Sequence, residues 1–342
     1  MEGIDEGAVT AWLAEHVGLV PPLGFELIAG GRSNLTFKVL DAAGRPVVLR
    51  RPPTGHVLPT AHDMSREHRV VTALGPTAVP VPETLGLCTD ASVNGAPFYV
   101  MEYVAGHVLR DLPAAEREMG EAGRRRASES LVGVLAALHA VDVEAVGLGD
   151  LGRKEGYLAR QLERWHGQFD RSQVDGVERH RAVDRVYERL SSSIPAQQGS
   201  TIVHGDYRLD NTVLADDGTV AAVLDWEICT LGDPLADVGL LMVYWTEPGD
   251  RTAALGSAPT VAAGFASREE LRTRYAVATG RDLSGLAYYV AFGYWKLACI
   301  LQGVYARYLG GAGGGDRSGV DMFGVQVRLL AEAAEQALAG VA

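Results

Sequence analysis

The stretch that decides the fold is residues 201–225, TIVHGDYRLDNTVLADDGTVAAVLD. It begins with a short apolar run at residues 201–203, which is typical of a strand that enters a loop. A second apolar run, at residues 220–224, ends at Asp225, and the Asp-Asp-Gly sequence at residues 216–218 is a turn signal. We therefore expect the two runs to pair as a hairpin, which would bring Asp225 back beside the loop.

The loop between the two runs carries Asp206 and Asn211, which are five residues apart. With Asp225 they would place two carboxylates and one amide oxygen in a single site. Phosphoryl transfer needs such a set, because one group must orient the attacking hydroxyl and oxygen ligands must hold Mg²⁺ on the nucleotide phosphates. Asp206 would serve the first purpose, and Asn211 and Asp225 the second. The spacing matches the catalytic-loop pattern H-R-D-L-x-x-x-N of protein kinases.

The segment HGDYRLDN, followed by VLDWEICTLGDPLADVGLL, resembles the aminoglycoside phosphotransferase-like branch of the kinase-like superfamily. Glycine after the histidine and Asp-Trp-Glu in place of Asp-Phe-Gly are features of that branch. The resemblance covers roughly residues 25–310. It implies an α+β, two-lobed protein-kinase-like fold. A small, mainly β lobe with one key helix would span residues 1–103, and a larger, mainly helical lobe would span residues 104–342.

The small lobe would supply the nucleotide contacts. A glycine-containing loop between two predicted strands could lay backbone N–H groups over phosphates, and Ser33 and Asn34 could add side-chain donors. The third strand, RPVVLRR, carries Arg50 where the kinase pattern has a lysine that contacts the α- and β-phosphates. Arginine can grip phosphate with two parallel hydrogen bonds, so the role is chemically preserved. A register shift of one residue would give this role to Arg51.

Glu67 shares the apolar face of a helix predicted at residues 61–75. A buried carboxylate needs a partner, and the resemblance implies that this partner is Arg50. The lobes are expected to join just after the β-rich run that ends near residue 102. There the resemblance implies that backbone groups of Glu102 and Val104 contact the adenine edge.

The resemblance also assigns roles around the catalytic loop. Arg208, two residues after Asp206, would neutralise charge near the transferred phosphoryl group. His204 would support the loop through hydrogen bonds to the backbone, and Asp237 would brace the loop from below. Neither an Ala-Pro-Glu motif nor a long loop follows Asp225, which argues against a protein substrate.

Composition excludes several classes of partner. The net charge of -12 and the pI near 5.2 argue against nucleic acid and anionic membrane surfaces. The three cysteines include no C-x-x-C pair, so we expect a protein of the reducing cytoplasm, without a disulfide framework or zinc site. The most apolar segment, residues 286–304, contains Lys296 and Gln302, which indicates a buried helix rather than a membrane span.

The predicted reaction is transfer of the ATP γ-phosphoryl group, with Mg²⁺, to a hydroxyl of a small molecule. The segments VLRRPP, LAALHAVD and YYVAFGYWKLA resemble the subgroup found fused to acyl-CoA dehydrogenases, which is linked to hydroxylated acyl substrates. A hydroxyacyl or other moderately apolar acceptor is therefore favoured, and an aminoglycoside is the alternative. A catalytically silent nucleotide-binding module is a further alternative, against which the complete set of Asp206, Asn211 and Asp225 argues. The sequence does not distinguish ATP from GTP.

Overall fold

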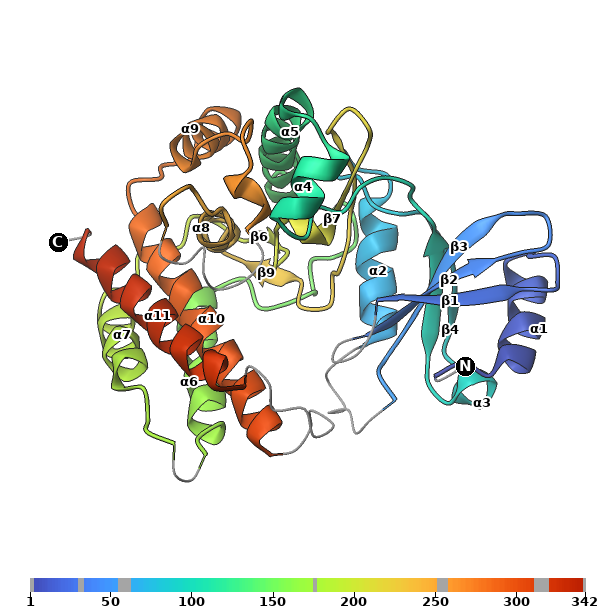
Figure 1. Cartoon of the computed structure of the whole chain (residues 1–342), viewed down its shortest axis with the longest axis horizontal. Helices are drawn as coiled ribbons and strands as arrows, with labels where there is room; N and C mark the ends of the chain where they lie inside the picture. The colour runs from blue at the N-terminus through green and yellow to red at the C-terminus, as the bar shows by residue number, and fades with distance from the viewer. Residues whose placement is uncertain are drawn as a thin grey trace.

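A computed structural model describes residues 3–29, 34–54, 63–174, 177–250, 258–310 and 320–340. The described chain forms two lobes, a small one built on a sheet and a large one made mainly of helices (Figure 1). This confirms the α+β, two-lobed fold class that the sequence predicts. The boundary between residues 103 and 104 stays a proposal.

The small lobe is a five-stranded antiparallel sheet with strand order β1-β2-β3-β5-β4. In Figure 1, helix α2 lies between this sheet and the large lobe, whereas α1 lies on the far side of the sheet. The elements of the lobe are α1 (Glu6–His16), β1 (Gly24–Ala29), β2 (Leu35–Leu40), β3 (Pro46–Arg51), α2 (Met64–Leu74), β4 (Thr84–Cys88), α3 (Ala91–Asn94) and β5 (Phe98–Glu102).

The two faces of this sheet have separate cores, because side chains alternate along each strand. Phe37, Leu49 and other buried residues of one face pack with α1. On the other face, Val48 packs with residues of β5 and α2. Arg50 shares the face of Val48, whereas Arg51 points to the opposite face, where it donates to backbone carbonyls that include that of Asn94. The register therefore places Arg50, rather than Arg51, on the side of the large lobe.

The large lobe surrounds two short antiparallel sheets, β6 with β9 and β7 with β8. Its core is continuous with the apolar face of α2, which contributes Val70, Val71 and Leu74. The elements are α4 (Leu112–Glu118), α5 (Glu121–His139), α6 (Tyr157–Arg171), α7 (Arg181–Ser192), β6 (Thr201–Val203), η1 (Leu209–Asn211), β7 (Thr212–Leu214), β8 (Val220–Val223), β9 (Thr230–Gly232), α8 (Leu235–Tyr244), η3 (Pro259–Val261), α9 (Arg268–Thr279), α10 (Leu286–Leu309) and α11 (Val320–Ala339).

The two apolar runs that the sequence predicts to pair with each other, β6 and β8, pair with other strands. Strand β8 pairs with β7, and β6 pairs with β9 instead. The turn at residues 216–218 is correctly located, but it joins β7 to β8. The run Thr-Val-Leu of β7 is only three residues long, and it follows directly on a 3₁₀ turn, so it shows no strand pattern of its own.

The connection between β4 and β5 contains Asn94 and Gly95, a pair that is typical of a two-residue hairpin turn. The structure has the short helix α3 there, and Gly95 ends it with a φ of 73°. Most of the predicted glycine loop, including Ser33, lies outside the described residues. No helix within the described ranges is both long enough and apolar enough to cross a membrane.

Candidate active site

The loop between β6 and η1 is held from below by Asp237 of α8. Its carboxylate accepts the backbone N–H groups of His204 (2.7 Å) and Gly205 (2.8 Å). Burial acts to raise the pKa of Asp237, but hydrogen bonds from His139 and the loop outweigh burial and lower it. The carboxylate is thus ionised and anchors the loop, as the sequence predicts.

His204 is fully buried and both of its ring nitrogens contact the backbone. Nε2 lies 2.9 Å from the carbonyl oxygen of Leu224, and the N–H of Asp206 donates to Nδ1 (3.2 Å). This pattern assigns the proton to Nε2, which donates to Leu224. The ring therefore ties the loop to the segment that carries Asp225. It supports the backbone rather than acting as a base.

The side chain of Asp206 is held on both oxygens. Oδ2 accepts a hydrogen bond from Nδ2 of Asn211 (2.9 Å) and lies 3.3 Å from Nε of Arg208. Oδ1 accepts a hydrogen bond from the hydroxyl of Tyr244 (2.8 Å). Burial and the neighbouring Asp206 raise the pKa of Tyr244, so its hydroxyl remains a proton donor. Because the amide hydrogens of Asn211 point at Asp206, its side-chain oxygen is the atom that can bind a metal.

Arg50 connects the two lobes through its guanidinium group. Nε lies 3.0 and 3.1 Å from the two carboxylate oxygens of Glu67, and Nη1 donates to the hydroxyl of Thr36 (3.3 Å). Nη2 donates to Oδ1 of Asp225. Burial acts to lower the pKa of Arg50, but Glu67 and Asp225 outweigh it and raise it. The predicted pairing of Arg50 with Glu67 is confirmed, and Arg50 also reaches a predicted metal ligand.

This part of the cleft holds more negative than positive charge. Glu67 is 1% exposed, and burial raises its pKa to about 7, opposed by Arg50 and reinforced by Asp225 and Glu227. Asn34, predicted to contact phosphates, donates to Oε2 of Glu227 (3.2 Å) and lies 3.5 Å from Oε2 of Glu67. Three carboxylates thus surround one guanidinium, a donor set that suits a divalent cation.

A cavity of about 460 Å³ lies between the lobes above these groups. Its lining includes Arg50, Asn211 and Asp225, which brings these three predicted residues to one place. Aliphatic side chains from both lobes, which include Val48 of β3 and Val213 of β7, also line the cavity and suit the faces of a flat aromatic base. Further lining residues are Glu67, Met101, Glu102, Tyr103, Val104, Val223 and Leu224.

Two of the residues that contact Asp206, Arg208 and Tyr244, also line a smaller hollow of about 30 Å³, together with Trp245 and Thr260 among others. The guanidinium of Arg208 lies 4.9 Å from the ring centre of Tyr244 and 3.0 Å from Asp210. The sequence gives no signal for Tyr244, because a tyrosine at the end of a helix has no distinguishing pattern.

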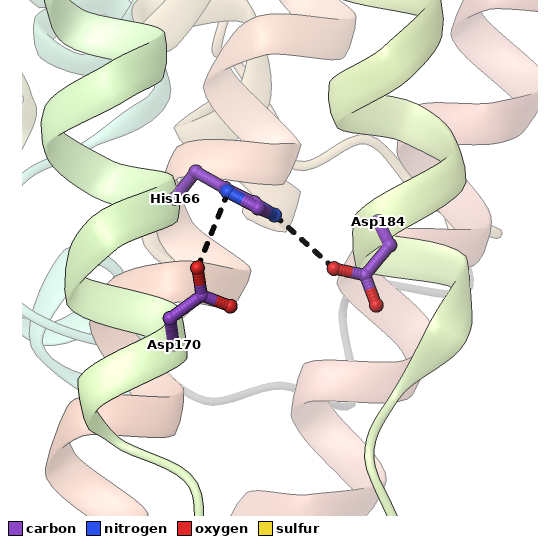
Figure 2. A group of neighbouring side chains, drawn as sticks. All are labelled: His166, Asp170 and Asp184. Atoms are coloured by element: carbon purple, nitrogen blue, oxygen red, sulfur yellow. Dashed lines mark hydrogen bonds and ion pairs between the residues drawn. The ribbon is translucent and has the colours of Figure 1, made fainter.

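A second group of potential metal ligands lies outside the catalytic loop, on α6 and α7. His166 lies between Asp170 and Asp184, within 3.6 Å of one and 3.1 Å of the other (Figure 2). Arg179 already donates to both carboxylates, at 2.6 Å to Asp170 and 2.7 Å to Asp184. The guanidinium supplies the positive charge that a metal would bring, so this group is an ion-pair network.

The chain matches the model of one protein family over most of its length. The model of the family described as "Phosphotransferase enzyme family" matches residues 24–288. The chain belongs to this family. Acyl-CoA dehydrogenase family member 10 of Mus musculus is 37% identical to this phosphotransferase family member over 287 residues, which are 82% of the chain and 26% of the relative. The chain spans less than half the length of the curated relatives it matches.

Solved structures agree with this family. The crystal structure named "putative aminoglycoside phosphotransferase" from Ralstonia eutropha JMP134 is 36% identical and has a TM-score of 0.80, covering 97% of this chain and 98% of that one. A thermostable mutant of aminoglycoside phosphotransferase APH(4)-Ia, solved with AMP-PNP and hygromycin B, has a TM-score of 0.63 at 17% identity, over 97% and 99% of the two chains. The latter likeness concerns the fold alone.

Proposed function

We propose that this family member transfers the γ-phosphoryl group of ATP to a hydroxyl of a small molecule, with Mg²⁺ as cofactor. The observation that supports this most directly is the oriented carboxylate of Asp206. It lies next to Asn211, which together with Arg50 and Asp225 lines one end of the cavity between the lobes. Catalysis of this reaction depends on positioning and on charge stabilisation, and these residues supply both.

Each residue has a role that follows from its contacts. Asp206 would accept a hydrogen bond from the acceptor hydroxyl, orient it towards the phosphate, and take its proton. Arg50, fixed by Glu67, would bind phosphate oxygens, and Arg208 would neutralise charge beside Asp206. Asn211 and Asp225 offer the oxygen ligands that would hold Mg²⁺, which when bound offsets the negative charge of the phosphates.

The nucleotide base would lie between the aliphatic side chains of the two lobes. The N–H of Glu102 donates to the carbonyl of Glu83 (2.8 Å), so the carbonyl of Glu102 and the backbone of Val104 are the polar groups we assign to the base edge. The AMP-PNP complex of the APH(4)-Ia mutant supports a nucleotide in a protein of this fold.

For the acceptor, the proposal favours a hydroxyacyl or similarly apolar molecule. The cation Arg208 lies beside Asp206 and over the aromatic ring of Tyr244. A polycationic aminoglycoside would instead require unpaired carboxylates, whereas Asp206 and Asp210 are both paired with Arg208. The chain's similarity to acyl-CoA dehydrogenase family members agrees with this choice.

The test is a product screen by mass spectrometry. The protein is incubated with ATP and Mg²⁺ and with parallel panels of hydroxyacyl-CoAs and aminoglycosides, and phosphorylated products are sought. The controls are Asp206→Asn, Asp225→Ala and EDTA. A phosphorylated hydroxyacyl product that all three controls abolish supports the proposal. Phosphorylated aminoglycosides alone would replace the acceptor class. ATP turnover that is equal in wild type and both variants would remove the enzymatic assignment.

A further inference from the structure

Lys296 is a buried cation in a largely apolar helix. It lies in the middle of α10, in the sequence GYWKLACIL, and is 4% exposed, while its neighbours Trp295 and Cys299 are fully buried. Burying an ammonium group is costly unless its charge is compensated. Methionine or leucine could fill the same space without that cost. The lysine therefore calls for an explanation beyond packing.

The contacts of Lys296 lead to the catalytic loop. Its Nζ donates to the carbonyl oxygen of Gly205 (2.8 Å) and lies 5.6 Å from the ring centre of Trp165 on α6. The carbonyl of Gly205 belongs to the peptide group that precedes Asp206. The N–H of the same peptide group donates to Nδ1 of His204. Both polar ends of this peptide are thus fixed by side chains, one of them by Lys296.

The peptide group on the other side of Gly205 is fixed as well, since its N–H donates to Asp237. Gly205 has a φ of 84°, which residues other than glycine rarely adopt. The carboxylate of Asp237 therefore accepts the N–H of Gly205, and the ammonium group of Lys296 donates to its carbonyl. Both contacts fix the glycine that directly precedes Asp206.

Three charged groups act on the side chain of Lys296. The charged groups around it are Asp206 on the loop, Asp237 on α8 and Arg164 on α6. Burial lowers the pKa of Lys296, and the two carboxylates oppose this effect. The ammonium group is thus attracted both by the catalytic carboxylate and by the carboxylate that braces the loop.

We propose that Lys296 is a positioning residue for Asp206. Its ammonium group holds the Gly205 carbonyl and thereby sets the direction in which the carboxylate of Asp206 faces the acceptor. This inference rests on the proposed function for the identity of the reaction. It adds a residue from α10, outside the loop motifs, to those that the reaction requires.

The experiment compares wild type with Lys296→Met, which keeps the length and bulk of the side chain but removes its charge and donor. The expected kcat is about 100-fold lower, because a small displacement of a catalytic group costs rates of this order, while KM for ATP stays within about twofold. The melting temperature is expected to be equal or higher, since the buried charge is replaced by a hydrophobic group. Deuterium exchange in the peptide spanning residues 203–211 is expected to be faster.

Two additional variants sharpen the comparison. Lys296→Gln retains a donor without the charge and should recover part of the lost kcat. Lys154→Met makes the same chemical change at an exposed lysine on the surface and should leave every readout unchanged. A purely structural lysine predicts the opposite pattern for Lys296→Met, namely a lower melting temperature with the kcat of the folded protein preserved.

Unchanged loop exchange in Lys296→Met would overturn the positioning role, and so would an unchanged kcat. The exchange and melting measurements need no substrate. If wild type forms no phosphorylated product with any acceptor, the proposed function fails, and the exchange measurement still decides whether Lys296 fixes the loop.

Discussion

Replacement of Arg50 by methionine should reduce stability in a way that depends on pH. Arg50 is 9% exposed and Glu67 is 1% exposed, so the variant leaves a buried carboxylate without its main partner. Removing one member of a buried ion pair typically costs about 3–5 kcal/mol. Arg50 is the principal group that lowers the pKa of Glu67, which is nevertheless raised to about 7. In Arg50→Met this pKa must rise further.

The sign of the effect follows from proton binding. Between about pH 4.3 and the raised folded pKa, folded Glu67 keeps a proton that the unfolded chain has released, so stability falls as pH rises. This loss is about 1.4 kcal/mol per pH unit, and in wild type it ends near pH 7. In Arg50→Met it continues to higher pH. From pH 6 to pH 8 the variant should therefore lose about 3 kcal/mol from this group, roughly twice the loss in wild type.

The assay is urea unfolding, followed by tryptophan fluorescence, at pH 6, 7 and 8 with EDTA present. The double variant Arg50→Met/Glu67→Met serves as the matched control, because it lacks the titrating group. The stability of the double variant should vary less with pH than that of wild type or of Arg50→Met. The reasoning is refuted if Arg50→Met is destabilised equally at pH 6 and pH 8, or if the double variant retains the steep pH dependence.

Three other changes test the loop. Tyr244→Phe removes the hydroxyl that holds Asp206, so kcat in the product assay should fall about tenfold while unfolding free energy changes by only about 1 kcal/mol; an unchanged kcat would exclude this role. Asp237→Asn should lower the unfolding free energy by about 2–3 kcal/mol at pH 7 and by less at about pH 2, because the lowered pKa means that stability from Asp237 is lost only as pH falls below the unfolded pKa of about 3.9; equal loss at about pH 2 and at pH 7 would contradict this. Gly205→Ala should cost about 1–2 kcal/mol in urea unfolding and reduce kcat, because φ is 84° and the new Cβ would lie 3.1 Å from Ile228; unaltered stability would argue against a strained backbone there.

Much of the fold and of the site could be predicted from local patterns. Side chains alternate along a strand such as RPVVLRR, which places Arg50 and Arg51 on opposite faces, and the helical spacing around Glu67 predicted its burial. Asp206 and Asn211 lie close together because they share one short loop. For Arg50, Arg51 and Glu67, the period of the strand or helix fixes the direction of the side chain.

The missed features depend on contacts between distant segments. Strand β7 is three residues long and is defined by its pairing with β8, so its own sequence was insufficient to predict a strand there. Tyr244 acquires its role from the path of α8 beneath the loop, and Lys296 from the packing of α10. In the sequence, Lys296 indicates only that its apolar run is not a membrane span, although a buried lysine also requires a buried acceptor.

The contact between Arg50 and Asp225 has a consequence for the order in which ligands arrive. On the proposed assignment, the nucleotide-free protein already neutralises a metal ligand with its own side chain. Free Mg²⁺ would have to compete with that built-in counterion, whereas a triphosphate offers the guanidinium a substitute anion and releases the carboxylate. Metal and nucleotide should therefore enhance each other's affinity, and by linkage to the same degree. We expect the cleft to load with the two together, not with bare magnesium first.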